Sequence, residues 1–222
     1  MAAGDGLFIS FEGLDGAGKS TQVASLGAAL RADGYQVITV RPNDTALGDV
    51  IAGVVLQHQQ SAPLLPWTEA LLFNAGRVQL LHEVILPALA DGAVVIADRY
   101  TDSTLAYQGG GRGIDLPALL RLHSDCCDDL WPDLTIYLDL PHELASRRQH
   151  AQQLPLDRIE GAPGDFHSRV HAMFEQLAAE HPRRIVRVDA NRPAVAISHD
   201  VMRAVVDRLE QRRSAPRPAV VR

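Results

Sequence analysis

The residues with the clearest chemistry form one short segment near the amino terminus. Residues 13–20 read Gly-Leu-Asp-Gly-Ala-Gly-Lys-Ser, which matches the phosphate-binding pattern G-x-x-x-x-G-K-[ST]. In such a loop the glycines turn backbone N–H groups inward around a polyphosphate, the lysine reaches the β- and γ-phosphates, and the serine hydroxyl ligates Mg²⁺. The alternative is an ordinary glycine-rich turn, but Lys19 is the only lysine of the chain. We therefore predict a nucleotide-polyphosphate site at Gly13, Leu14, Asp15, Gly16, Ala17, Gly18, Lys19, Ser20 and Thr21.

An acid and an arginine follow the third apolar run of the chain. Asp98 is placed to hold Mg²⁺ or its waters, and Arg99 is placed to bind a second substrate that carries a phosphate. The alternative for this pair is a structural Arg–Asp contact. The placement favours phosphoryl transfer to a phosphate acceptor over hydrolysis.

Apolar, β-branched runs alternate with amphipathic stretches along the chain. This alternation predicts right-handed crossovers and a parallel sheet. The predicted fold is one P-loop α/β domain over residues 1–213, in which helices cover both faces of a five-stranded parallel sheet in a three-layer α/β/α arrangement. Strands are expected at residues 7–11, 36–40, 93–97, 134–138 and 185–188, and helices near 19–32, 67–90, 101–125, 141–150, 164–180 and 193–212.

Three segments do not fit this pattern. Residues 42–65 contain several prolines and polar runs, and no regular element is predicted there. Residues 150–164 are polar and rich in proline and glycine, and we expect a mobile lid at about 147–163. Residues 214–222 offer little apolar surface to bury and are expected to be disordered.

Composition excludes several classes of protein. The 222 residues are 46% hydrophobic and 22% charged, which is typical of a globular domain, and the net charge is −6. An excess of acids argues against nucleic acid or an anionic membrane as the main partner. There is no apolar run of the ~18 residues that span a bilayer and no recognisable secretory signal. The two cysteines are adjacent, so a cytoplasmic protein without disulfides is expected.

Beyond the phosphate loop, several motifs occur in an order that resembles the thymidylate kinase family. The similarity covers about residues 7–210, and the stretch 98–108 discriminates best, because general nucleotide kinases share the phosphate loop without it. The matching segments are 11–22 (FEGLDGAGKSTQ), 72–77 (LFNAGR), 98–108 (DRYTDSTLAYQ), 137–141 (YLDLP) and 157–160 (DRIE).

The resemblance implies the fold predicted above and an enzyme that transfers the γ-phosphate of Mg·ATP to dTMP. It also implies a homodimer formed through the long central helices. Two alternatives stay open. One is a kinase for another nucleotide or deoxynucleotide, or a divergent paralogue with a specialised acceptor. The other is a P-loop switch that holds or hydrolyses nucleotide without a second substrate.

Carried over to this chain, the resemblance also implies an acceptor site. Phe73 would stack on the thymine, and Tyr107 would crowd the sugar 2′ position and so favour deoxyribose. Each has a simpler reading, because Phe73 could be a core residue and Tyr107 a helix-packing residue. The other implied acceptor contacts are Asp15 at the 3′-hydroxyl, Arg77 at the nucleotide, Arg41 and Arg99 at the phosphate, Ser103 and Thr104 at the base edge (or as helix caps), and Gln108.

Phosphoryl transfer also needs positive charge around the γ-phosphate. In the family this charge comes from an arginine in the phosphate loop or from arginines in the lid. This loop offers only Lys19, so the lid is expected to supply Arg147 near ATP, with Arg148 and Arg158 joining Lys19, Arg99 and Asp15 as catalytic residues. A solvated helix end is the alternative for Arg147 and Arg148.

Overall fold

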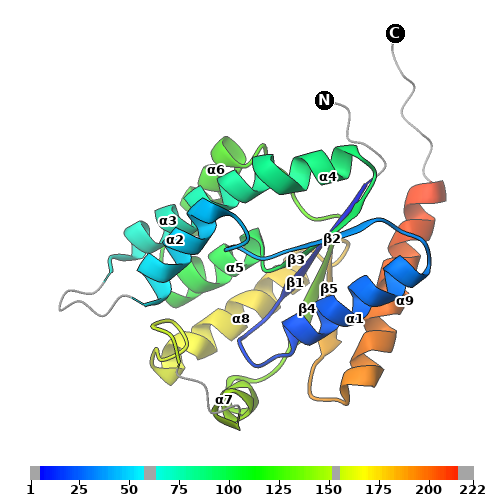
Figure 1. Cartoon of the computed structure of the whole chain (residues 1–222). Coiled ribbons are helices and arrows are strands. Elements are labelled where there is room, and N and C mark those ends of the chain that lie inside the picture. Colours follow the sequence, from blue (N-terminus) through cyan, green and yellow to red (C-terminus); the bar gives the residue numbers. More distant parts are fainter. Residues whose placement is uncertain (1–5, 58–63, 152–155, 215–222) are drawn as a thin grey trace.

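A single parallel sheet forms the frame of the molecule. The computed structural model describes residues 6–57, 64–151 and 156–214. Within them, five parallel strands lie in the order β2-β3-β1-β4-β5 (Figure 1). The fold class predicted from the sequence is confirmed, and each strand lies within one residue of its predicted bounds. The strands are β1 (Leu7–Glu12), β2 (Val37–Val40), β3 (Val94–Asp98), β4 (Leu134–Asp139) and β5 (Ile185–Asp189).

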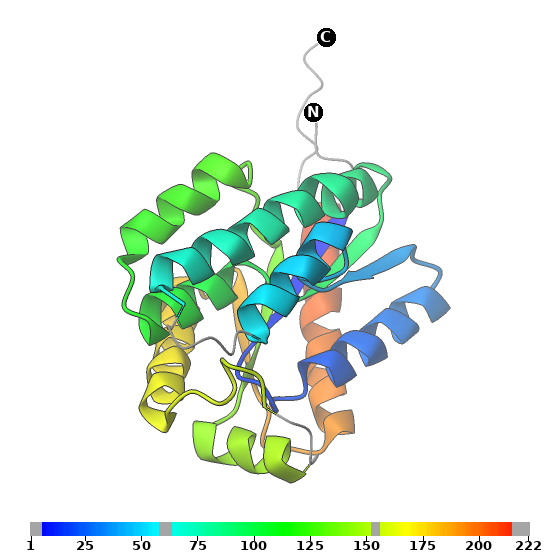
Figure 2. The ribbon, with the colours of Figure 1, turned by 60° about the vertical axis from the view of Figure 1, so that its left-hand side comes forward.

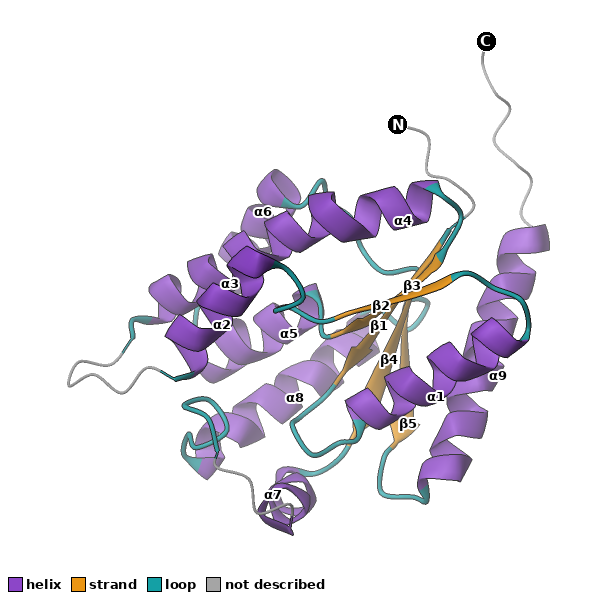
Figure 3. Ribbon diagram, in the orientation of Figure 1, coloured by secondary structure: helices purple, strands orange, loops and turns teal. Residues whose placement is uncertain are grey.

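Helices cover both faces of this sheet, as Figure 3 shows. The helices α1 (Lys19–Ala32) and α9 (Ala194–Ser214) pack side by side on one face, seen again in Figure 2. The opposite face carries the other helices, except α7, which lies near the carboxyl edge of the strands. Their bounds are α2 (Ala46–Leu56), α3 (Pro66–Leu80), α4 (Leu86–Ala90), α5 (Thr101–Thr104), α6 (Leu116–Cys126), α7 (His142–Ala151) and α8 (Gly164–Glu180). No described helix is both long and apolar enough to cross a membrane.

The predicted helix at 67–90 is interrupted by a wider turn. Helix α3 continues through a π-helical segment, η1 (Leu81–Ile85), into α4. Pro87 lies one residue beyond the start of α4. Proline has no N–H and its ring clashes with the preceding helical turn, so a local widening here has a direct cause.

The single helix predicted at 101–125 is wrong. The structure instead has the short helix α5, a π-helical segment η2 (Leu105–Gly111), and then α6 after a turn. Gly113 has a φ of +78°, which ends the first helix, and the Asp115 side chain caps α6 by accepting the Ala118 N–H at 3.2 Å. Both turn residues lie in the sequence GRGID, where helix-breaking chemistry is visible in retrospect.

Residues 42–65 also differ from the prediction, because α2 lies within them. Thr45 caps this helix by accepting the Gly48 N–H at 3.0 Å. Two glycines and several β-branched residues lower its intrinsic helix propensity, and packing against α3 overcomes that deficit.

The predicted lid and tail fall partly outside the described residues. The lid segment 147–163 begins inside α7, so its first residues are helical, and residues 152–155 lie outside the described range. Ser214 ends α9, whereas 215–222, where disorder was expected, lie outside it as well.

A run of three glycines lets η2 pack tightly against α8. A Cβ placed on Gly111 would approach the Phe166 ring to 2.4 Å, and one on Gly110 would approach the Met173 Cβ to 2.7 Å. Because η2 carries Tyr107 and Gln108, this close contact fixes the helix that presents them.

We expect Gly111→Ala to destabilise the protein by about 1–3 kcal/mol, because the added methyl group overpacks the contact with Phe166. Gly53→Ala in α2 is the matched control: its Cβ would meet no atom within 4 Å, and we expect a gain of up to ~1 kcal/mol. Urea unfolding of both variants measures the difference. Equal effects at the two positions would contradict the packing argument.

Candidate functional site

The phosphate loop follows the buried strand β1 and leads directly into α1. Gly13, Gly16 and Gly18 have φ values of +132°, +86° and +94°. A Cβ on Gly13 would also lie 2.5 Å from the Leu138 carbonyl oxygen. All three positions need the backbone freedom of glycine, and Gly13 and Gly16 also need its small size, because a Cβ on Gly16 would lie 2.5 Å from the Ala145 carbonyl oxygen.

Lys19 is buried at the first turn of α1 and reaches back across the loop. Its Nζ donates to the carbonyl oxygens of Gly13 at 3.2 Å and Leu14 at 3.0 Å, and to Asp15 Oδ1 at 3.3 Å. Burial, followed by the nearby Arg99, lowers the pKa of Lys19, while Asp15 partly offsets this shift. The chain thus holds its single lysine at the centre of the loop.

The two predicted metal ligands meet at the same place. The Ser20 Oγ donates to Asp98 Oδ2 at 2.7 Å, which joins α1 to the carboxyl end of β3. Ser20 is exposed and Asp98 is buried. A hydroxyl and a carboxylate oxygen side by side suit Mg²⁺, which prefers oxygen ligands, so these residues fit the predicted ion.

A cavity of about 290 Å³ adjoins the phosphate loop. It collects eight of the nine residues that the family resemblance assigned to the acceptor. Those eight are Asp15, Phe73, Arg77, Arg99, Ser103, Thr104, Tyr107 and Gln108.

Arg41 is the predicted acceptor residue that does not line this cavity. Its side chain is 65% exposed and forms an ion pair with Asp44 at 3.3 Å. The neighbouring Pro42 and Asn43 line the cavity instead. The assignment of Arg41 to the acceptor phosphate stays a prediction.

Arg99 connects the cavity to the phosphate loop. Its Nη2 donates to Asp15 Oδ1 at 2.5 Å and to the Tyr107 hydroxyl at 3.1 Å, and its guanidinium lies 4.9 Å from the centre of the Tyr107 ring. The Tyr107 hydroxyl donates in turn to Asp15 Oδ2 at 3.2 Å. Burial alone would raise the pKa of Asp15, but Arg99 and Lys19 hold it well below its usual range. An ionised Asp15 therefore lies between the two halves of the site.

Arg77 and Phe73 project from α3 into the same cavity. Arg77 hydrogen-bonds to the Thr104 hydroxyl and, at 3.3 Å, to the Asn74 side chain. Phe73 is half-buried, lining the cavity while packing against the main core. It is thus both a packing residue and a cavity residue.

Two of the three lid arginines bond to groups outside the phosphate loop. Arg147 is exposed on α7, and Arg148 donates to the Ala190 carbonyl oxygen at 3.0 Å. Arg158 donates to the Val55 carbonyl oxygen at 2.8 Å and to the Glu69 carboxylate. The latter contacts attach residues 156–163 to α2 and α3.

Glu69 is a buried residue that sequence reasoning missed. It accepts hydrogen bonds from Gln108 at 2.8 Å, from Arg112 and from Arg158. Burial would raise the pKa of Glu69, but these bonds hold it below its ordinary value. A charged residue within the apolar pattern of α3 was the available signal.

Other cavity residues were also missed, among them Tyr100, Asp157 and Ile159. Tyr100 follows Arg99 directly, and the other two lie within the DRIE segment, so all three belong to motifs that carry the family resemblance. Most of the remaining missed residues are apolar, and nothing in the sequence distinguishes them from core residues.

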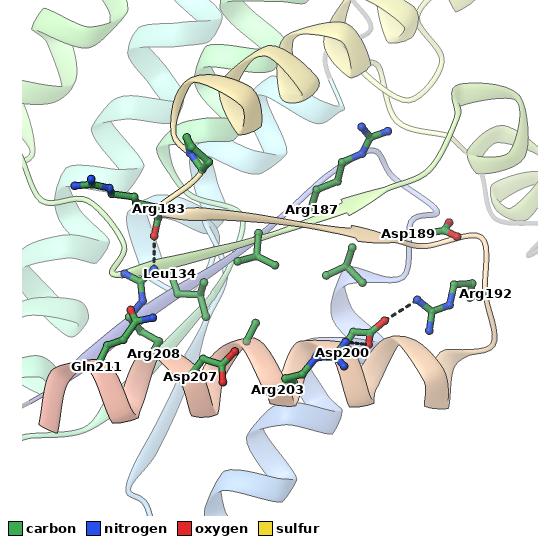
Figure 4. A pocket seen from close by; sticks show the side chains of 14 residues that line it. Leu134, Arg183, Arg187, Asp189, Arg192, Asp200, Arg203, Asp207, Arg208 and Gln211 are labelled. Atoms are coloured by element: carbon green, nitrogen blue, oxygen red, sulfur yellow. Dashed lines mark hydrogen bonds and ion pairs between the residues drawn. The ribbon is translucent and has the colours of Figure 1, made fainter. Parts of the chain in front are cut away.

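A separate hollow of about 660 Å³ lies between β5 and α9 (Figure 4). It contains none of the predicted site residues. Most of its arginines are paired: Arg192 and Arg203 contact Asp200, Arg187 contacts Asp139, and Arg208 donates to backbone carbonyl oxygens. This hollow presents no uncompensated charge cluster comparable to the phosphate loop.

Comparison with known proteins matches the sequence of this chain to one family. The family model described as thymidylate kinase matches residues 11–201. A thymidylate kinase of Thermomicrobium roseum is 43% identical over 210 residues, covering 94% of this chain and 99% of the relative. The thymidylate kinase of Deinococcus radiodurans is 44% identical over 204 residues, covering 91% and 98%. That of Pelotomaculum thermopropionicum is 41% identical over 206 residues, covering 92% and 95%.

The family model spans the phosphate loop, the acceptor cavity and the segment that carries Arg158, so the match includes both halves of the site. With its parallel sheet and with relatives that align over nearly their whole length, this chain belongs to the thymidylate kinase family.

Proposed function

We propose that this chain transfers the γ-phosphate of Mg·ATP to the phosphate of dTMP, giving dTDP and ADP. The observation that carries the proposal is the contact of Arg99 with Asp15, which joins a phosphate loop to a cavity lined by aromatic and hydroxyl side chains. Family membership supports the same reaction, and it leaves the alternative of a nucleotide-binding switch without support.

On the donor side, the backbone N–H groups of the phosphate loop and Lys19 bind the β- and γ-phosphates. Ser20 and Asp98 are the residues that would hold Mg²⁺, which when bound neutralises charge on the ATP phosphates. Thr21 extends this site along the exposed start of α1.

On the acceptor side, Arg99 binds the dTMP phosphate and aligns it with the γ-phosphate. Phe73 stacks on the thymine, while Arg77, Ser103, Thr104 and Gln108 are the polar groups available to its edges. Tyr107 and Asp15 contact the sugar. The attacking oxygen belongs to a phosphate that is already ionised, so no general base is needed.

The lid arginines complete the positive charge around the transferring phosphoryl group. Arg148 and Arg158 would have to exchange their present partners, the Ala190 carbonyl and Glu69, to reach it. Arg147 is exposed and has no hydrogen-bond partner among the residues that the structure describes, so it can turn toward ATP from α7.

We further propose a homodimer formed through α2 and α3. Leu47, Val50 and Val54 lie on one stripe of α2, and Trp67 and Leu71 lie on one stripe of α3. All five are exposed, by 44% to 63%, and the two helices pack together. Contiguous exposed apolar residues of this kind mark an interaction surface. The cytoplasmic location and the lack of nucleic-acid and membrane partners stay predictions from the sequence.

The reaction is tested by following ADP formation from Mg·ATP with dTMP, dUMP, UMP, dCMP, AMP and thymidine as separate acceptors. We expect dTMP to give the highest kcat/KM. Lys19→Ala should nearly abolish turnover while the protein stays folded, because the remaining loop lacks a cation at the phosphates. Preference for another acceptor would reassign the cavity, and full activity of the lysine variant would exclude the donor site.

We expect Tyr107→Phe to reduce the preference for dTMP over its ribose analogue by roughly tenfold, because the hydroxyl that crowds the 2′ position is removed. Tyr137→Phe is the control: its hydroxyl contacts Asp139 at 3.2 Å and does not line the cavity. The measurement is the ratio of kcat/KM values for the two acceptors. An unchanged ratio in the Tyr107 variant would rule out its role in sugar selection.

We expect Val50→Glu to convert the dimer to a monomer, because it places a charge in the centre of the apolar α2 stripe. Val195→Glu on α9 is the control, since Val195 is 67% exposed and its helix α9 lies on the other face of the sheet. Sedimentation velocity gives the mass of each variant. A wild-type monomer, or a dimer that survives the α2 substitution, would disprove this interface.

A further inference from the structure

Glu12 is a fully buried carboxylate to which no role has been given. It is the last residue of β1, its exposed fraction is 0%, and it precedes the phosphate loop directly. A buried carboxylate is costly unless its oxygens are paired. Its partners therefore indicate what it is there to hold.

Both oxygens of Glu12 contact the segment that follows β3. Oε1 accepts the backbone N–H of Tyr100 at 2.7 Å, and Oε2 accepts the Ser103 hydroxyl at 2.5 Å. The Ser103 Oγ in turn accepts a hydrogen bond from Arg99 Nη1 at 3.0 Å. Glu12 thus holds Arg99 in two ways: it bonds to the peptide N–H that follows Arg99, and it bonds to the Ser103 hydroxyl that contacts the Arg99 guanidinium.

The backbone conformation of Arg99 explains why these contacts with Glu12 are needed. Arg99 has a φ of +76°, in the left-handed region, which costs an L-residue with a side chain roughly 1–2 kcal/mol. Its own N–H donates to the Phe11 carbonyl oxygen at 3.0 Å, and the next N–H donates to Glu12. Two consecutive hydrogen bonds to the end of β1 therefore hold this strained peptide.

We propose that Glu12 is the positioning residue for Arg99: it fixes the strained backbone and orients the guanidinium toward the acceptor phosphate. The assignment of Arg99 to that phosphate rests on the proposed function. The Glu12 carboxylate does not line the cavity and touches no reacting group, so it acts only through Arg99 and Ser103.

The charges around Glu12 make its hydrogen bonds to Tyr100 and Ser103 sensitive to pH. Burial first, and then the Asp102 carboxylate of α5, raise the pKa of Glu12 to about 7, whereas Ser103, Arg99 and the Tyr100 N–H oppose the shift. Asp102 is itself paired with Arg184 at 2.6 Å. The carboxylates of Asp15 and Asp98 also attract the Arg99 guanidinium and raise its pKa.

The direction of the pH effect follows from these partners. When Glu12 is protonated its oxygens carry no negative charge, so its hydrogen bonds from the Tyr100 N–H and the Ser103 hydroxyl become weaker. The hold of Glu12 on Arg99 and Ser103 therefore becomes stronger as pH rises through about 7. The stability of the fold changes in the opposite direction. In the unfolded chain the pKa of Glu12 is its ordinary 4.5, whereas in the folded chain it is about 7. Between pH 4.5 and about 7 the contribution of Glu12 to the free energy of unfolding therefore falls as pH rises.

Glu12→Gln tests the proposal because glutamine is a neutral analogue of the protonated acid. At pH 8 we expect the KM for dTMP, and its dissociation constant by calorimetry, to rise about tenfold, with the KM for ATP unchanged. The dTMP phosphate also titrates near pH 6, so the ratio of variant to wild type is compared at each pH. This ratio should approach one below pH 6.

Two further variants separate positioning from folding. Asp133→Asn is the control, because Asp133 accepts the Phe8 N–H at 2.8 Å at the other end of β1 and should leave dTMP affinity unchanged. Asp102→Asn keeps Glu12 but removes its repulsive neighbour, so the rise in dTMP affinity should move to lower pH. This variant also decides the question if Glu12→Gln does not fold. An unshifted profile would overturn the proposal.

A readout independent of catalysis distinguishes this inference from the proposed reaction. Hydrogen exchange of the Tyr100 amide should be faster in Glu12→Gln, whatever the acceptor is. If the wild-type protein fails to phosphorylate dTMP but Tyr100 exchange is still faster in Glu12→Gln, the proposed reaction is wrong and the positioning of Arg99 by Glu12 is supported. If dTMP turnover is normal and neither affinity nor exchange changes in the variant, Glu12 has no positioning role.

Discussion

The organisation of the molecule depends on one ion pair, between the Asp15 carboxylate and the Arg99 guanidinium. Asp15 belongs to the loop after β1, and Arg99 follows β3, so the contact joins two loops from separate parts of the sequence. It is possible because β1 and β3 are adjacent and in register, with Phe11 opposite Asp98. Everything that the sheet and its helices achieve for phosphoryl transfer converges on keeping these two side chains together.

The parallel sheet brings this about by geometry alone. All strands point the same way, so every loop that follows a strand emerges at one edge. β1 lies at the centre of the order, with β3 and β4 beside it. The loop after β1 and the first turn of α1 therefore meet residues from both neighbouring strands: Asp98 bonds to Ser20, and the Leu138 carbonyl lies close to Gly13. The helices fill the faces and bring Phe73, Arg77 and Tyr107 to the same edge.

Sequence reasoning placed residues correctly where their own motif sets their position. Gly13 and Gly18 need left-handed conformations in any chain that forms this loop, and Phe73 and Tyr107 enter the cavity because their helices fix their direction. It failed where tertiary partners decide. Helix α2 forms despite its own glycines because it packs against α3. Arg158 pairs with Glu69 across 89 residues, a contact that no local pattern encodes. Glu12 was visible as a charge ending an apolar strand, but its partners were not.

The single lysine has a practical consequence for studying this protein. Its ammonium is buried, its pKa is lowered, and it lies among the carbonyl oxygens of the phosphate loop. Every other basic side chain is arginine or histidine, so an amine-selective acylating reagent has only Lys19 and the terminal amine to modify. We expect bound nucleotide to reduce the extent of Lys19 modification further, so that a mass measurement reads the occupancy of the phosphate loop without an engineered label.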